Sequence, residues 1–176
     1  MHSFDETFER ELAPLHRYLA RRLGASAAED IASETFAVAY RRWDAFDQTR
    51  AVRPWLYGIA ANLMRRRWRD ERRKLRAYAR TGIDPVQLEE DAAIGRADAS
   101  LLHRELAAVL AELRPQDREI LLLSAWAELS HEEIAAALSL PVGTVKSRLH
   151  RTRERVRNRL EGSGQMETTT LMTQNR

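Results

Sequence analysis

The sequence predicts an all-α protein made of two small helical domains joined by a flexible acidic linker. Apolar residues recur at helical intervals of three and four, and no stretch alternates apolar with polar residues as a half-buried strand would. Glycine and proline are scarce, with 7 and 5 among 176 residues. We expect domains at residues 1–80 and 99–161, a linker at 81–98 and a disordered tail at 162–176.

Composition excludes several classes of protein. The chain has no cysteine, so it carries no disulfide framework, thiolate metal site or thiol nucleophile. No apolar run approaches the roughly 18 residues of a membrane span, and the acidic first residues do not resemble a signal peptide. We therefore expect a cytoplasmic protein without membrane insertion, and no metal or other cofactor.

Helix signals divide the first domain into three segments. A capping box of Ser3 and Glu6 opens the first helix, and Gly24 ends it. A second capping box, Ser26 with Glu29, is expected to open the next helix, which runs to about residue 43. After a turn-like polar stretch, a third helix holds a proline at position 54 in its first turn and runs to about residue 79.

The second domain is predicted to contain four shorter helices. The first covers about residues 101–113, and Pro115 begins another that ends near residue 126. A third capping box, Ser130 with Glu133, opens a short helix that ends at Leu138. After a tight turn, Thr144 starts the last helix, which we expect to end near residue 160.

Charge is distributed in blocks although the net charge is only +3. Residues 65–80 hold nine basic and two acidic side chains, and residues 142–161 hold seven basic and two acidic ones. Residues 84–98, between these blocks, hold five acidic side chains and one arginine. Two basic blocks at the ends of amphipathic helices favour two surfaces that face a polyanion such as nucleic acid.

The last two predicted helices have the shape of a helix-turn-helix. In the final helix Val145, Leu149, Val156 and Leu160 form an apolar face, while polar and basic residues occupy the opposite face. Lysine and arginine donate to guanine in the major groove, serine bonds to several bases, and arginines at the margin neutralise phosphates. The shape alone leaves an ordinary solvated helix equally open.

Residues 113–160 resemble the C-terminal domain of bacterial sigma factors, most closely the extracytoplasmic-function (ECF) group. The resemblance rests on Leu-Arg-Pro-Gln-Asp-Arg-Glu-Ile, Leu-Ser-His-Glu-Glu-Ile-Ala and Pro-Val-Gly-Thr-Val-Lys-Ser-Arg-Leu. It implies that this module binds the −35 promoter element. Glu128 and Ser139 stand where the family often has glycine. The candidate −35 contacts are Thr144, Lys146, Ser147, Arg148, His150, Arg151 and Arg155.

The first domain resembles the sigma segments that bind polymerase and open the −10 element. Glu-Asp-Ile-Ala-Ser-Glu-Thr-Phe, from residue 29, resembles the helix that docks on core RNA polymerase, which implies contacts from Asp30, Ser33 and Glu34. Val-Arg-Pro-Trp-Leu-Tyr-Gly-Ile-Ala-Ala-Asn-Leu, from residue 52, resembles the melting segment, whose loop at 47–53 would pocket an extruded base. The implied −10 contacts are Asn62, Arg65, Arg66, Arg67 and Arg69.

These observations favour a non-enzymatic sigma factor that binds core RNA polymerase and promoter DNA. The resemblance also implies an anti-sigma factor as a partner. The alternative is a stand-alone helix-turn-helix regulator that binds duplex DNA without polymerase. An enzyme is disfavoured because His131-Glu-Glu-Ile-Ala lacks the second histidine of a zinc protease motif and the chain has no phosphate-binding glycine loop.

Overall fold

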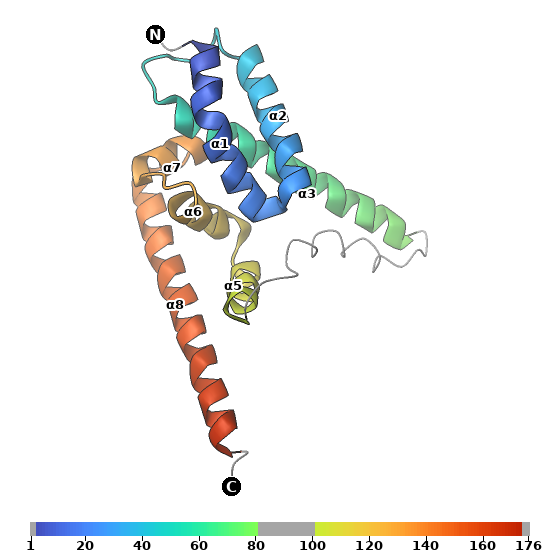
Figure 1. The fold of residues 1–176 in the computed structure, drawn as a ribbon, viewed down its shortest axis with the longest axis vertical. Helices are drawn as coiled ribbons and strands as arrows, with labels where there is room; N and C mark the ends of the chain where they lie inside the picture. The colour runs from blue at the N-terminus through green and yellow to red at the C-terminus, as the bar shows by residue number, and fades with distance from the viewer. Residues whose placement is uncertain (1–2, 81–100, 174–176) are drawn as a thin grey trace.

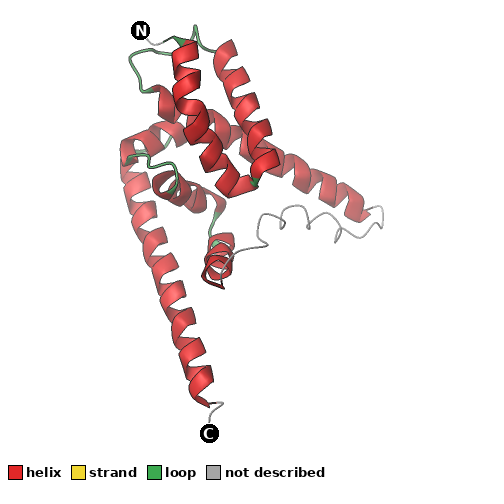
Figure 2. Ribbon diagram, viewed as in Figure 1, coloured by secondary structure: helices red, strands yellow, loops and turns green. Residues whose placement is uncertain are grey.

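The computed structural model describes residues 3–80 and 101–173, and all regular elements in these two ranges are helices (Figures 1 and 2). The all-α class is confirmed. The predicted acidic linker lies outside the described residues. The first half contains α1 (Phe4–Leu23), α2 (Ala25–Arg41) and α3 (Val52–Arg80). The second half contains α5 (Leu101–Glu112), α6 (Pro115–Ala125), α7 (His131–Leu138) and α8 (Val142–Thr173).

A single glycine makes the turn between α1 and α2. The predicted capping box at Ser3 and Glu6 is present, with both backbone-to-side-chain distances at 3.1 Å. Gly24 has φ +84°, a left-handed conformation that glycine adopts without steric cost, and it both ends α1 and caps α2. The predicted capping box at Ser26 was wrong, because the one-residue turn lets α2 begin at Ala25.

The third predicted capping box, Ser130 with Glu133, and the helix-turn-helix are confirmed. The Ser130 hydroxyl accepts from the Glu133 backbone N–H at 3.1 Å, and the Glu133 carboxylate accepts from the Ser130 N–H at 2.8 Å. The following helix, α7, ends at Leu138 with Ser139 as its C-cap, and α8 begins at Val142. Figure 1 shows α8 leaving the turn as a long helix that extends away from the other elements.

Two turn residues adopt a backbone conformation that favours glycine. Glu128 has φ +55° and Ser139 has φ +54°, the positions at which the sequence resemblance expects glycine. A left-handed residue other than glycine costs about 1–2 kcal/mol. We predict that Glu128→Gly and Ser139→Gly each raise the free energy of unfolding by about 1 kcal/mol, measured by urea denaturation. Ala136 is an exposed site inside α7, so Ala136→Gly should lower the free energy of unfolding by a similar amount. A change of the same sign in all three variants would contradict this explanation.

The last helix continues beyond its predicted end. We expected it to stop near residue 160 and to be followed by a disordered tail at 162–176. The structure carries α8 to Thr173, so the expected helix end near residue 160 was wrong, and residues 174–176 lie outside the described residues. The tail contains no proline that would break the helix, although its two glycines and four threonines are poor helix formers.

The two halves pack against each other through α3 and α7 and share one continuous core. Leu56 and Ala60 of α3 and Ile134 of α7 belong to the same cluster of buried apolar residues. Arg22 of α1 forms two 2.6 Å hydrogen bonds with the carboxylate of Glu119 in α6. Figure 1 shows α6 and α7 lying beside the three N-terminal helices.

Candidate nucleic-acid interface

The first turns of α8 present a polar face to solvent. Val145 and Leu149 are fully buried and fix how the helix is rotated on α6 and α7. As a consequence, the predicted base-reading side chains lie on the exposed side, while Thr144 and Arg148 are half-buried at its margin. The exposed candidates are Lys146, Ser147, His150, Arg151 and Arg155.

Short contacts hold several of these side chains in place. Arg148 donates to Gln116 at 2.6 Å and contacts Asp117 at 3.3 Å, so it is tied to the start of α6. Lys146 lies 3.8 Å from Glu132 in the first turn of α7. This link crosses the helix-turn-helix, so it orients the lysine without burying it.

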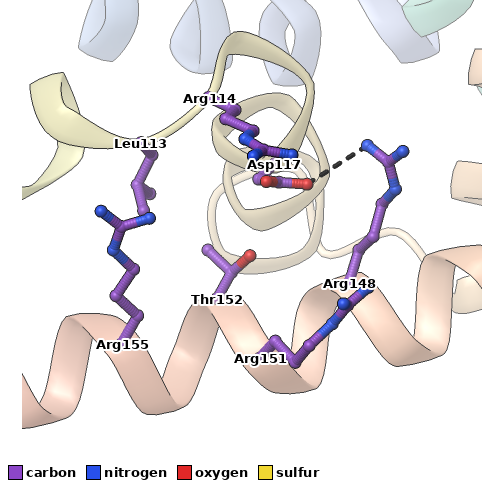
Figure 3. Close-up of a pocket in the computed structure, with 7 residues that line it drawn as sticks. All are labelled: Leu113, Arg114, Asp117, Arg148, Arg151, Thr152 and Arg155. Carbon is purple, nitrogen blue, oxygen red and sulfur yellow. Dashed lines mark hydrogen bonds and ion pairs between the residues drawn. The ribbon is translucent and has the colours of Figure 1, made fainter.

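A pocket of about 280 Å³ lies between the start of α6 and α8 (Figure 3). Its floor contains Leu113 and Thr152, both buried. Asp117 is the only acidic side chain that lines it, and it is engaged by Arg148. Such a cluster of guanidinium groups with one carboxylate suits a phosphate group, which arginine binds in a bidentate manner. The lining arginines are Arg114, Arg148, Arg151 and Arg155.

Arg114 is the residue that sequence reasoning missed. It precedes α6 as its N-cap, and its side chain is exposed at the mouth of the pocket. Figure 3 shows it on the α6 side of the pocket, opposite the arginines of α8. Arg114 and Arg155 are far apart in sequence, so no local pattern indicated that they share a pocket.

A second pocket, of about 390 Å³, lies at the loop that was predicted to hold an extruded base. Aromatic rings form a stack beside it: Phe46 lies 4.3 Å from Trp55 and 5.9 Å from Trp43, measured between ring centroids. The buried carboxylate of Glu11 lies between Arg10 and Arg53. The lining residues are Arg10, Glu11, Trp43, Phe46, Gln48, Thr49, Arg50, Ala51, Val52 and Arg53.

Local hydrogen bonds shape the rim of this loop pocket. The Asp47 carboxylate accepts from the Thr49 hydroxyl at 2.6 Å and from the Thr49 backbone N–H at 3.0 Å. These bonds lower the pKa of Asp47 below its ordinary value. The turn that they close is compact enough to leave Gln48 and Arg50 exposed at the mouth of the pocket.

The basic part of α3 begins at Arg65, about three helical turns beyond Arg53 of the loop pocket. Asn62 is exposed, and its side-chain oxygen accepts from Arg65 at 2.6 Å. Arg66, Arg67 and Arg69 are also exposed. Of the aromatic residues in this helix, Tyr57 is buried in the core and Trp55 is half-buried.

The three candidate polymerase contacts share one exposed edge of α2. Asp30, Ser33 and Glu34 are all exposed, whereas Ile31 and Thr35 face the core. Asp30 lies 3.6 Å from Arg67 of α3. Asp30, a predicted polymerase contact, thus lies beside Arg67, a predicted contact of the −10 strand.

Comparison with protein families matches both halves of the chain. The Sigma-70 region 2 model matches residues 7–74, and the Sigma-70 region 4 model matches residues 103–156. The ECF RNA polymerase sigma factor SigW of Bacillus subtilis is 35% identical over 159 residues, covering 83% of this chain and 82% of that protein. The RNA polymerase sigma-E factor of Streptomyces coelicolor is 35% identical over 133 residues, covering 76% and 71%.

Solved structures with a similar fold include two complexes. The sigma factor RpoE, bound to the anti-sigma factor NepR from Bartonella quintana, aligns with a TM-score of 0.68 at 23% identity, over 90% of this chain and 96% of that one. CnrH, bound to the cytosolic domain of CnrY, aligns with a TM-score of 0.63 at 26% identity, over 90% of this chain and 88% of that one.

Within residues 3–80 and 101–173, no helix combines the length and apolar character needed to cross a membrane.

Proposed function

The chain belongs to the ECF group of bacterial RNA polymerase sigma factors and directs transcription initiation, and we propose how its surfaces divide that task. The start of α8 reads the −35 element as duplex, the loop pocket and α3 hold the opened −10 strand, and α2 docks on core polymerase. The matched family segments at 7–74 and 103–156 support domains at residues 1–80 and 99–161, with 81–98 as the linker.

The −35 assignment rests on the exposed face of α8. Arginine and lysine can donate to the O6 and N7 atoms of guanine, and serine can bond to either kind of base. Lys146, Ser147, His150 and Arg151 supply these groups within the first three turns of the helix. We assign Arg114 and Arg155 to a backbone phosphate beside this base-reading face, because their pocket contains four guanidinium groups and one acid.

The −10 assignment is carried by the loop pocket, the single observation that most favours strand opening. An extruded base needs an aromatic surface on which to stack, polar groups that bond to its edge, and cationic groups for the adjoining phosphates. The pocket provides Trp43 and Phe46 as aromatic surfaces, Gln48 and Thr49 as polar groups, and Arg50 as a cationic group. Its volume of about 390 Å³ is in the range of small-ligand pockets.

The role of α2 is electrostatic docking. Carboxylates along one exposed helix edge complement a basic surface, which sets orientation and association rate more than affinity. Asp30 is half of an ion pair with Arg67, with both side chains largely exposed. Glu34 lies one turn further along the same edge. We assign both carboxylates to the polymerase contact.

The role is non-enzymatic and cytoplasmic in this proposal. Sigma factors direct a polymerase rather than transform a substrate, and the assigned side chains bind rather than react. An anti-sigma factor is a proposed partner, supported by the similar fold of a sigma factor that is bound to one.

Filling the loop pocket tests the −10 assignment. Ala51 lines the pocket and is exposed, so Ala51→Trp should occupy the space for a base without disturbing the core. For wild-type holoenzyme, an abasic site at one opened −10 position should weaken binding about tenfold or more, because base stacking contributes about 1–3 kcal/mol. For Ala51→Trp, intact and abasic strands should bind equally.

Ala45→Trp is the matched control, since Ala45 is exposed in the same loop and does not line the pocket. This variant should keep the abasic penalty. If the Ala51→Trp holoenzyme still binds every abasic strand more weakly than the intact strand, the loop pocket does not hold the extruded base.

A further inference from the structure

A buried acid from α1 lines the loop pocket. Glu11 belongs to neither the loop nor α3, and it is only 7% exposed. One of its carboxylate oxygens, Oε1, accepts from the Arg10 Nε–H at 2.9 Å. The other oxygen, Oε2, lies 3.9 Å from the Arg53 Nε atom, which is too long for a hydrogen bond. Oε2 can therefore still accept a hydrogen bond from a ligand.

A buried donor lies beside this oxygen. Within the described ranges, 3–80 and 101–173, the Arg53 Nε–H has no hydrogen-bond partner. The guanidinium is held in place, because its central carbon lies 5.8 Å from the centre of the buried Tyr57 ring. Buried polar atoms in native proteins nearly always have a partner. The unpaired donor and the adjacent acceptor indicate a polar partner that enters through the loop pocket, which both residues line.

The open geometry of this pair differs from that of a closed ion pair in the same protein. Arg22 and Glu119 approach to 2.6 Å and form hydrogen bonds at both carboxylate oxygens. Glu11 and Arg53 stay 3.9 Å apart beside a pocket of about 390 Å³. A ligand can therefore bond to both side chains without breaking a hydrogen bond between them.

A carboxylate in a pocket for DNA selects for hydrogen-bond donors. It repels the phosphates of the strand, and as an acceptor it can bond only to N–H groups of the bases. Adenine, cytosine and guanine each carry an exocyclic amino group, and acidic side chains accept from such groups, as from the N4 amine of cytosine. Thymine has no amino group, and its ring N–H lies between two carbonyl oxygens that a carboxylate repels.

We propose that Glu11 makes the loop pocket select an extruded base that carries an amino group and reject thymine. The Glu11 Oε2 atom accepts from the amino group, and the Arg53 Nε–H donates to an acceptor atom of the same base. The rings of Trp43 and Phe46 can stack on any base, so the choice falls to this polar pair. The inference rests on the proposed function, because it concerns the base that the loop pocket holds.

Matched base analogues test this selection on the wild-type holoenzyme. The abasic scan of the −10 strand first locates the position that enters the pocket. At that position cytosine is compared with uracil and adenine with hypoxanthine, which exchange an amino group for a carbonyl oxygen, and guanine with hypoxanthine, which lacks the 2-amino group. In at least one pair we expect the amino-bearing base to bind at least tenfold more tightly. A smaller difference in all three pairs, or a preference for the analogue, would overturn the proposal.

Glu11→Gln tests whether this carboxylate makes the selection. An amide can donate to a carbonyl oxygen as well as accept from an amino group, so discrimination in the preferred pair should fall below about threefold. Glu11→Asp keeps the charge beside Arg10 and Arg53 but shortens the reach, and it should lose discrimination to the same extent. Discrimination retained by either variant, with helix content unchanged by circular dichroism, would overturn the role of Glu11.

Glu9→Gln is the matched control, since Glu9 is exposed on the same helix and does not line the pocket. It should discriminate as the wild type does. A loss of discrimination in Glu9→Gln would assign the effect to the charge of α1 rather than to the pocket, and would overturn the proposal.

Failure of the proposed function gives a different result. If no abasic position weakens binding by the wild-type holoenzyme, no base enters the pocket, and the −10 assignment fails together with this inference. If an abasic penalty is present but amino-bearing bases are not preferred, the pocket holds a base and only the selection by Glu11 is overturned.

Discussion

Replacing Arg151 with alanine should reduce initiation by about 10- to 100-fold at a promoter with an intact −35 element. Arg151 is exposed on the proposed base-reading face of α8, and a bidentate contact to a base discriminates by about 1–3 kcal/mol. At a promoter whose −35 element is scrambled, the variant and the wild type should initiate equally. The measurement is run-off transcription with reconstituted holoenzyme on the two templates.

Arg114→Ala supplies the contrast, because it removes a proposed phosphate contact without touching a base. It should weaken binding to both templates uniformly, and the slope of log affinity against log salt should fall by about one. The two variants therefore separate base reading from phosphate binding. An Arg151→Ala loss of equal size on intact and scrambled −35 elements would contradict the assignment of Arg151 to a base.

Leu149→Ala should lower the free energy of unfolding of the second half by about 2–5 kcal/mol. The side chain is 1% exposed, and truncating a buried leucine loses transfer free energy and leaves a cavity. Since Leu149 and Val145 fix the rotation of α8, −35 reading should weaken too, although Leu149 is buried away from DNA. Urea denaturation measures the stability. Run-off transcription on templates with an intact and a scrambled −35 element measures recognition of that element.

Asn158→Ala is the stability control, because Asn158 is exposed on the same helix. Its effect should stay within about 0.5 kcal/mol. A change of less than 1 kcal/mol in Leu149→Ala would show that the recognition helix is not held by this core, and the account of how its polar face is oriented would fail.

Local signals in the sequence predicted the helices well. Ser3 with Glu6 and Ser130 with Glu133 form capping boxes as expected, because each depends only on residues three positions apart. The Ser26 box failed because its competitor was equally local: Gly24 turns the chain within one residue and starts α2 earlier. The end of α8 was missed because the glycine- and threonine-rich composition after residue 161 favoured disorder over helix.

Long-range features of the site could not be predicted in the same way. Arg22 and Glu119 are 97 residues apart in sequence, and neither lies in a pattern that indicates a buried pair. Arg114 joins the arginines of α8 only because α6 packs on that helix. The exposed polar face of α8 was accessible to sequence reasoning, since helical periodicity alone separates it from Val145 and Leu149.

The most direct test of the central claim is run-off transcription by core polymerase with and without this chain, on promoters whose −35 and −10 elements are altered one at a time. We predict no specific initiation by core alone, initiation with the chain present, and a loss when either element is altered. We also predict that the isolated chain binds promoter duplex only weakly. Tight, specific duplex binding by the chain alone, without association with polymerase, would contradict the account and indicate a stand-alone regulator.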